Sequence, residues 1–305
     1  MSSKVLSYCL YEPKAMPQHR FWDPHKNDSA RYWFNLPVLG MVNNILYSDF
    51  TMKIHVSENV WDNKLSKILE IMTSELENVV VETIDMEYDF TEPGIWRMRP
   101  LWAREAADIF HTRDLDSLPS EAEYRFTIFF EKSSCSLGTI RTHENHYGAK
   151  CRMLAGLSSF KPQKIPPNIK WDSFNTYYSF RHGRPSSNQM LHGNYTTDQD
   201  LMIKFFTTNE EFTKDNFLDF ATYNQKNKQD FVCVEATEGE IFGFEIEEQQ
   251  RKMLDSIREY FGEFWAGAPL DVRGPFMNSI LESAPTIKER INSNNTLREF
   301  YQRSL

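Results

Sequence analysis

The stretch that decides the fold is "FTMKIHVSENVWDNKLSKILEIMTSELENVVVETI", residues 50–84. Its two ends, 50–56 and 78–84, are short runs of β-branched and other apolar residues, which is typical of strands. Apolar residues between these runs recur at the spacing of one helical face: Leu65, Ile68, Leu69, Met72 and Leu76. A strand, a helix and a strand at this spacing form a βαβ unit, and the stretch therefore predicts a parallel sheet.

The same alternation continues on the N-terminal side and further along the chain. Residues 4–11 and 107–112 have strand character. Residues 31–47 supply an earlier crossover helix, in which Pro37 must lie near the start or kink the helix. We therefore expect an α/β fold in which strands and helices alternate.

Further elements follow the strand at 107–112. Ser120 followed three residues later by Glu123 has the form of a capping box, which predicts a helix from this point. Residues 135–143 and 230–236 are strand candidates, and residues 247–265 carry apolar residues at helical spacing.

Composition restricts the class of protein. The chain has 305 residues, 40% of them hydrophobic and 14% aromatic, which is enough for a sizeable core. The net charge of −9 argues against a broad nucleic-acid-binding face, so we expect no nucleic-acid partner. Four scattered cysteines argue against a disulfide framework and a zinc ribbon. With no apolar run long enough to span a membrane and no signal-peptide pattern, we expect a cytoplasmic protein without a membrane span.

An acidic motif follows the strand at 107–112. Asp114 and Asp116 lie where open α/β sheets bind ligands, between the end of a strand and the next helix. Two carboxylates at i and i+2 on a bent loop can bind one hard divalent cation, which removes their mutual repulsion. Mg²⁺ or Mn²⁺ held by few protein ligands completes its shell with water and phosphate oxygens, so a diphosphate is the expected ligand. The alternative is a solvated turn, because D-x-D is a common tripeptide.

Three arginines accompany this motif. Arg97 and Arg99 alternate as in an extended segment, so both could point into one pocket and hold a phosphate or Asp114. We expect the following segment to become helical beyond Pro100. Arg113 could neutralise diphosphate charge, or form a salt bridge that orients an aspartate. For Arg97 and Arg99 the alternative is a solvated pair.

Five blocks of the sequence occur in the same order as in a known family of proteins. They are YCLY (8–11), IWRMRPL (95–101), HTRDLDSLPSEAE (111–123), GTIRTHENHYGAKCRMLAGL (138–157) and NYTTDQDLM (194–202). In this order they resemble a family of D-x-D-containing glycosyltransferases, best known from large viruses that infect chlorella-like algae and with distant bacterial relatives. The resemblance covers about residues 4–205, and its most specific piece is R-D-x-D-S.

The resemblance implies a GT-A fold, a nucleotide-sugar donor bound through Mn²⁺ or Mg²⁺, and a product such as the glycan of a viral capsid protein. Asp114 and Asp116 would hold the metal–diphosphate unit, and YCLY would lie along the base and ribose. The implied donor-binding set is Tyr8, Leu10, Tyr11, Arg97, Arg99, Arg113, Asp114, Arg141 and Gly156. The chain departs from its relatives where Arg141 is followed by Thr142, because relatives have an aspartate there.

Two further groups are candidates for the chemistry. His143 follows the strand at 135–143, and a histidine often completes the metal shell in related transferases; its alternative is a surface or packing role, as for His146. Asp198 and Asp200 would open a helix, where a carboxylate can be a cap. If the enzyme inverts the anomeric centre, one of them is our candidate for the base that takes the acceptor proton.

We therefore expect an α/β protein with a GT-A-like, Rossmann-type mixed sheet flanked by helices and a C-terminal α+β extension. Residues 1–205 would form the nucleotide-sugar-binding catalytic domain, and residues 206–305 the extension, packed on it and binding the acceptor. The expected activity is transfer of a hexose or pentose from a nucleoside-diphosphate sugar, such as UDP-glucose or UDP-xylose, to a hydroxyl of a glycan or glycoprotein acceptor. The alternatives are a nucleotidyltransferase acting on sugar phosphates and a non-catalytic module that binds nucleotide sugars or glycans.

Overall fold

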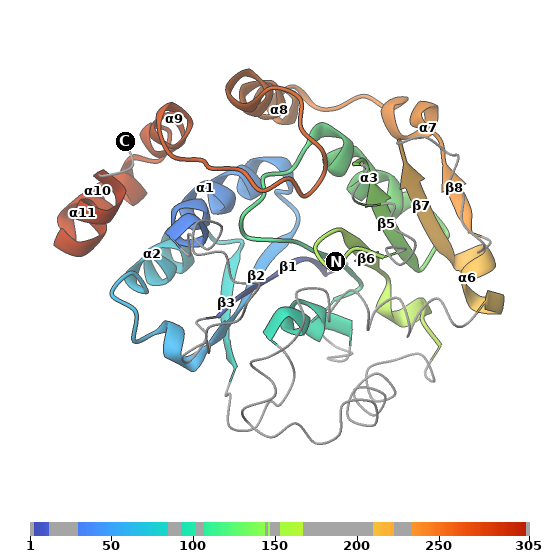
Figure 1. The fold of residues 1–305 in the computed structure, drawn as a ribbon, viewed down its shortest axis with the longest axis horizontal. Helices are drawn as coiled ribbons and strands as arrows, with labels where there is room; N and C mark the ends of the chain where they lie inside the picture. The colour runs from blue at the N-terminus through green and yellow to red at the C-terminus, as the bar shows by residue number, and fades with distance from the viewer. Residues whose placement is uncertain are drawn as a thin grey trace, which may run out of the picture.

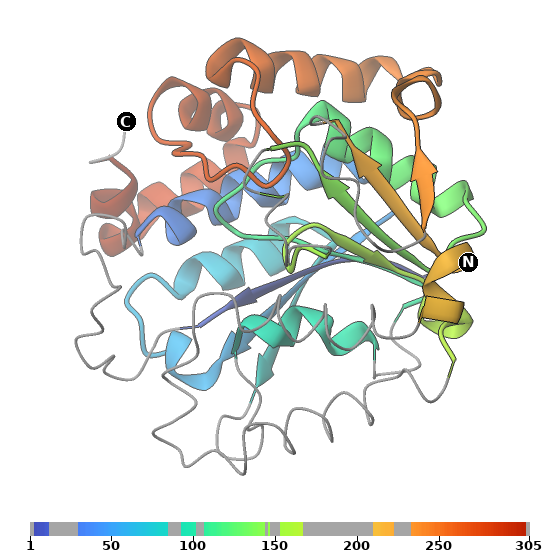
Figure 2. The same ribbon diagram turned by 45° about the vertical axis from the view of Figure 1, so that its right-hand side comes forward.

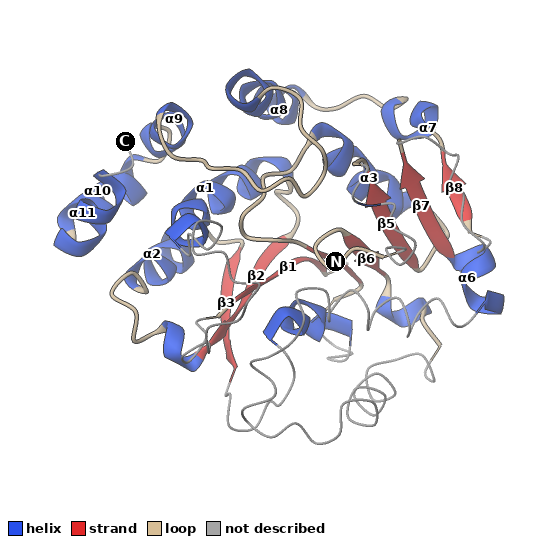
Figure 3. Cartoon of the chain, viewed as in Figure 1, coloured by secondary structure: helices blue, strands red, loops and turns tan. Residues whose placement is uncertain are grey.

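The computed structural model describes residues 3–11, 30–84, 93–101, 107–143, 146, 153–166, 210–222 and 233–302. These residues form one eight-stranded mixed sheet with helices packed on it, which confirms the predicted α/β fold class. Figure 3 shows the strands as one continuous twisted layer with most helices above it.

The sheet has the strand order β3-β2-β1-β4-β6-β5-β7-β8. Its strands are β1 (Lys4–Leu10), β2 (Thr51–Ser57), β3 (Val79–Ile84), β4 (Ile109–Thr112), β5 (Leu137–Arg141), β6 (Ser158–Phe160), β7 (Phe217–Ala221) and β8 (Val234–Ala236). Every pairing is parallel except those of β6, which runs antiparallel to both β4 and β5. The carboxyl ends of β1, β4 and β5 therefore lie at the same edge of the sheet.

The helices form layers on the two faces. Those of five residues or more are α1 (Ala30–Leu46), α2 (Lys67–Glu75), α3 (Glu121–Lys132), α6 (Glu210–Asn216), α7 (Glu238–Phe242), α8 (Glu248–Phe261), α9 (Pro275–Glu282), α10 (Pro285–Ser293), α11 (Asn295–Gln302) and the 3-10 helix η2 (Pro93–Leu101). Two short 3-10 turns are η1 (Glu58–Val60) and η4 (Pro162–Lys164). Figures 1 and 2 show α1, α2 and α3 on one face, with α8 to α11 outside them, and η2, in teal, on the other face.

The βαβ unit predicted from residues 50–84 is present as β2, α2 and β3. Strands β1 to β3 follow one another toward one edge, whereas β4 pairs with the other side of β1. The direction of strand addition thus reverses between β1 and β4. Such a reversal leaves a crevice at the carboxyl ends of the two strands, which is where open α/β sheets bind ligands.

Helix α1 contains Pro37 in its middle rather than near its start. Proline has no N–H, so the carbonyl of Trp33, four residues earlier, cannot receive its helical hydrogen bond. The hydroxyl of Tyr301 on α11 donates to this carbonyl at 2.7 Å, and Tyr301 is buried. The C-terminal helix therefore satisfies a backbone group that the proline leaves without its usual donor.

The segment beyond residue 205, predicted as an extension packed on the catalytic domain, contributes two strands to the same sheet. Strands β7 and β8, from the expected extension, continue the sheet through the parallel pairing of β7 with β5. Buried residues of α8 to α11, such as Ile257 and Leu297, share one hydrophobic cluster with Tyr8 of β1 and Ile54 of β2. The sequence prediction missed this because β7 is five residues long, and its pairing depends on a partner far away in the chain.

Within the described residues, no helix has both the length and the apolar character needed to cross a membrane.

The helix predicted at 247–265 is α8, which ends at Phe261 because Gly262 adopts a positive φ of 69°.

Candidate functional site

The acidic motif lies at the carboxyl ends of β1 and β4, where the strand order reverses. We call residues 113–118 the aspartate loop. Ser7 of β1 is in register with Thr112, the last residue of β4, so the loop begins beside the carboxyl end of β1. On its other side Ser120 caps α3 by accepting the Glu123 N–H at 3.2 Å, as the sequence predicted. The motif is thus fixed between a buried strand and a capped helix.

Asp114 is held from two directions. Its Oδ1 forms an ion pair with the guanidinium of Arg97 on η2, and Arg97 also donates to the carbonyl of Gly94 at 2.9 Å. Gly156 lies against the other carboxylate oxygen: a Cβ added there would meet Asp114 Oδ2 at 1.9 Å. The Asp114 side chain is 39% exposed, so it remains available to a ligand.

Gly156 occupies a tight turn before β6. The N–H of Leu157 donates to the carbonyl of Leu154 at 3.0 Å, and Ser158 is hydrogen-bonded to Thr112 at the end of β4. Gly156 was predicted to bind the donor. In the structure the missing side chain of Gly156 makes room for Asp114.

Asp116 pairs with a different arginine. Its Oδ2 lies 2.7 Å from Arg31 at the start of α1, and its side chain is only 13% exposed. Burial and the neighbouring Asp114 carboxylate raise the pKa of Asp116 to about 6, while Arg31 opposes this shift. The Asp114 carboxylate is thus close enough to disfavour the charge of Asp116. Arg31 was missed by the sequence analysis, because nothing in its spacing connects it to a motif more than eighty residues later.

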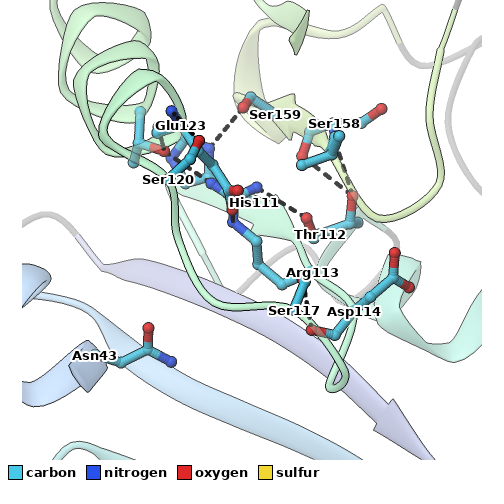
Figure 4. Close-up of polar contacts among 12 residues, drawn as sticks. Asn43, His111, Thr112, Arg113, Asp114, Ser117, Ser120, Glu123, Ser158 and Ser159 are labelled. Atoms are coloured by element: carbon cyan, nitrogen blue, oxygen red, sulfur yellow. Dashed lines mark hydrogen bonds and ion pairs between the residues drawn. The ribbon is translucent and has the colours of Figure 1, made fainter. Parts of the chain in front are cut away.

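Arg113 was predicted to contact a diphosphate or to pair with Asp114 or Asp116. In the structure its side chain runs back into the protein, toward α3, whereas Asp114 lies on the other side of the backbone (Figure 4). Its guanidinium is 2.6 Å from Glu123 and donates to Thr127 at 2.8 Å. Arg113 therefore anchors the loop from inside, and its ion pair is with Glu123 rather than with either aspartate.

The four residues of YCLY, which were predicted to lie along a nucleotide, differ in exposure. Tyr8 and Leu10 face the helices and are buried, and the Tyr8 hydroxyl accepts a hydrogen bond from Asn43 at 2.9 Å. Burial raises the pKa of Tyr8. Tyr11 is 40% exposed and packs edge to face on Trp96, at 6.2 Å between ring centroids. The alternation of side chains along β1 explains why adjacent members of the motif face opposite sides.

Arg97 and Arg99 do not share a pocket. The expected extended segment is the 3-10 helix η2, which begins before Pro100, and residues 102–106 lie outside the described residues. Arg99 reaches Glu82 of β3 at 3.2 Å, and Glu82 also contacts His55 and Lys53. Hydrogen bonding to His55 and Lys53 holds the pKa of Glu82 well below its usual range. Arg99 thus fastens η2 to the sheet and sets the position from which Arg97 reaches Asp114.

Arg141, also predicted to bind the donor, is buried in a bidentate pair with Asp219 of β7. Its position at the end of β5 thus serves the pairing of two strands. Asp198 and Asp200, the two candidates for the catalytic base, lie outside the described residues.

His143 was predicted to complete a metal shell. Its ring instead stacks on Trp265, at 4.0 Å between centroids and 26° between planes. Over the ranges the structure describes, no three His, Cys, Asp or Glu side chains gather as a metal site, so His143 does not join the two aspartates.

The aspartate loop is also contacted by residues 265–270, from the C-terminal part of the chain, which the sequence did not predict. Leu270 N–H donates to the Asp116 carbonyl at 2.8 Å, and Ser117 pairs with Pro269. At the other end of this 265–270 segment, Ala266 N–H donates to Thr142 Oγ1 at 2.8 Å. Glycine and proline in "WAGAPL" are turn signals, but they do not indicate which loop the turn contacts.

Asp114 and Asp116 fit a divalent cation in their chemistry. Both offer hard oxygen ligands, and a cation would relieve what raises the pKa of Asp116, namely its burial and the neighbouring Asp114 charge. Two carboxylates are a sufficient protein contribution for Mg²⁺ or Mn²⁺ when water and substrate phosphates supply the other oxygens. Within the protein itself, Arg97 and Arg31 provide compensating positive charge.

Neither a protein-family model nor a curated protein sequence matches this chain, so the functional argument rests on its own residues and geometry.

Proposed function

We propose that this protein is a metal-dependent glycosyltransferase that moves a sugar from a nucleoside-diphosphate sugar to a hydroxyl of a glycan acceptor. The observation that carries the proposal is the position of Asp114 and Asp116, paired carboxylates at the point where strand order reverses. The resemblance of the R-D-x-D-S block to D-x-D transferases supports the same activity. A donor with a uridine diphosphate group is the first to test.

The arrangement of the loop favours a binding site over a solvated turn. A solvated D-x-D turn would leave both carboxylates in water and free of specific partners. Here each has its own arginine, Asp116 is largely buried, and Gly156 leaves space for Asp114 alone. Side chains held this closely are typical of sites that must present a fixed geometry.

The residues of the site have separable roles in this proposal. Asp114 and Asp116 would hold the cation, which when bound stabilises the charge that develops on the departing diphosphate. Arg97, released from Asp114, can donate to a phosphate oxygen, and charged hydrogen bonds of this kind are strong. Tyr11 offers an exposed ring at the carboxyl end of β1 for the nucleoside.

The test measures binding of UDP and release of sugar from radiolabelled UDP-sugars, with Mn²⁺ or with excess chelator. Asp116→Asn should reduce metal-dependent sugar release by at least about 100-fold, as loss of an electrostatic group at a reaction centre does. Its free energy of unfolding should change by less than about 1 kcal/mol, because the substitution removes a charge from a largely buried side chain and Arg31, which loses its partner, is 30% exposed and can be solvated. The matched control is Asp255→Asn, at an exposed ion pair on α8.

Each other outcome points to a different function. Equal UDP affinity in excess chelator would contradict the metal requirement. Release of pyrophosphate from a nucleoside triphosphate and sugar phosphate would identify a nucleotidyltransferase. Binding of the nucleotide sugar without release of sugar, with or without acceptor, would identify a non-catalytic module.

A further inference from the structure

An aromatic pair lies at the same edge of the sheet as the aspartate loop. Trp265 is 36% exposed, although large aromatic side chains are usually buried, and its ring stacks on His143. His146 packs edge to face on His143, at 5.8 Å between centroids. Because the Trp265 ring stacks on the His143 ring, its exposed part forms a restrained apolar surface.

The backbone around the pair is fixed at three points. Thr142, next to His143, donates its N–H to His146 Nδ1 at 3.3 Å and accepts from Ala266 N–H at 2.8 Å. Trp265 is further held by the hydrogen bond from Ala268 N–H to its carbonyl at 3.0 Å. These bonds fix the backbone on both sides of the pair, and the stacking on His143 restricts the indole itself before any ligand binds, which reduces the entropic cost of binding.

The topology places the pair next to the aspartates. Strand β6 separates β4 from β5, so residues at the same level, such as His111 and Gly138, are two strand spacings apart, about 9.5 Å, and β5 continues beyond this level to Arg141. His143 follows β5 and the aspartate loop follows β4. The 265–270 segment also joins the two, since it presents Trp265 at one end and contacts Asp116 at the other.

The pair lies on the opposite side of the aspartates from Tyr11. Along the edge of the sheet the order is β1 with Tyr11, β4 with the aspartate loop, β6, and β5 with His143 and Trp265. A transferase needs its acceptor across the reacting centre from the nucleoside of its donor. If the nucleoside lies at β1, the remaining side is the one on which Trp265 and His143 lie.

We infer that Trp265, stacked on His143, is the acceptor subsite, and that it binds the apolar face of a pyranose ring of the acceptor glycan. This inference rests on the proposed function for its choice of acceptor over donor. Aromatic rings suit sugars because a pyranose has an apolar face of C–H groups beside hydrogen-bonding edges, which an indole can cover.

The experiment compares Trp265→Ala, Trp265→Phe and Tyr260→Ala with the unmodified protein. Tyr260 is a control of similar character, an exposed aromatic residue on α8. Binding of a panel of methyl glycosides is measured by calorimetry, and the acceptor KM for transfer is measured with the best of them. Trp265→Ala should weaken glycoside binding and raise the acceptor KM by about three- to tenfold, the range for loss of one stacked ring. Trp265→Phe should recover most of the loss, and the affinity for UDP should change by less than twofold.

The inference is overturned if no glycoside binds the unmodified protein, if Trp265→Ala binds glycosides normally, or if it loses UDP affinity to the same extent. If the proposed function itself is wrong, the result is different: no sugar is released from the donor, whereas glycosides still bind at Trp265.

Discussion

The protein contains two kinds of arginine–carboxylate pair, and they differ in exposure. Inside, Arg113 and Glu123 are 4% and 1% exposed, and Arg141 with Asp219 is similarly buried. At the aspartate loop, the carboxylate of Asp114 is 39% exposed, and Arg31 facing Asp116 is 30% exposed. Buried pairs cannot exchange partners without leaving a charge unsolvated, whereas the outer pairs can, because water and ligands reach them. The inner pairs therefore stabilise the fold, and the outer ones are available for binding.

The largest expected effect is the loss of stability when the inner pair of Arg113 and Glu123 is broken. Glu123→Gln leaves the buried Arg113 guanidinium without its counter-charge, and this should lower the free energy of unfolding by about 3 to 5 kcal/mol. Urea denaturation followed by circular dichroism measures it. The control is Glu248→Gln, at a pair that is exposed on both sides, which should cost less than about 1 kcal/mol. Equal, small effects in both variants would remove the distinction between the two kinds of pair.

The next effect concerns an outer pair. Arg97→Ala should weaken UDP binding by about 1.5 to 3 kcal/mol, or about 10- to 150-fold, if its guanidinium transfers from Asp114 to a phosphate. Calorimetric titration in the presence of Mn²⁺ measures the affinity. Arg99→Ala removes an arginine from the same turn whose partner is Glu82, so any effect on UDP should be smaller. Tighter binding in Arg97→Ala would mean that Arg97 only competes for Asp114.

Gly156→Ala tests the space around Asp114 without changing any charge. The added Cβ overlaps the carboxylate, so Asp114 must move, with a cost in stability of about 1 to 3 kcal/mol and a loss of UDP affinity. Gly239→Ala is the matched control, because a Cβ there meets nothing within 4 Å in helix α7. It should be neutral or stabilise by up to about 1 kcal/mol. A fully active, stable Gly156→Ala variant would show that the position of Asp114 is not restricted.

The smallest effect is a pH dependence near the inner pair. Burial, followed by the positive charges of Arg113, Lys161 and Lys4, lowers the pKa of His111 well below its usual value. The unfolded chain therefore binds a proton below about pH 6.5 that the folded protein does not, so stability falls as the pH falls through that value, by at most about 1.4 kcal/mol per pH unit for this group. His111→Asn should flatten the dependence of the unfolding free energy on pH between 6.5 and 5. The same slope in both proteins would contradict the assignment.

The sequence predicts the frame of the site better than its contacts. Periodicity identified the βαβ unit, and the cap at Ser120 identified the start of α3, because these signals are local. Asp114 and Asp116 were placed at a strand end for the same reason. A single strand end, together with the next helix, was enough to locate the loop.

The partners of the aspartates were not predictable, because they depend on how distant segments meet. Arg31 and the 265–270 segment reach Asp116 from opposite directions along the chain. Arg113 shows the converse: its position next to the motif suggested a ligand contact, but the alternation of side chains at the end of β4 turns it inward. Neighbours in sequence on an extended segment face opposite sides, so proximity to a motif is a poor guide to its function.

The hydrogen bond from Tyr301 to the Trp33 carbonyl also orders events during synthesis. The two residues are 268 positions apart. At about 5 to 20 residues per second, a ribosome needs roughly 15 to 50 s to add Tyr301 after Trp33 has been made. During that time α1 has a proline-interrupted turn whose carbonyl must be hydrated, so the helix cannot yet be buried as it is in the finished protein. We therefore expect nascent chains arrested before α11 to be protease-sensitive at α1, although every residue of that helix is already present.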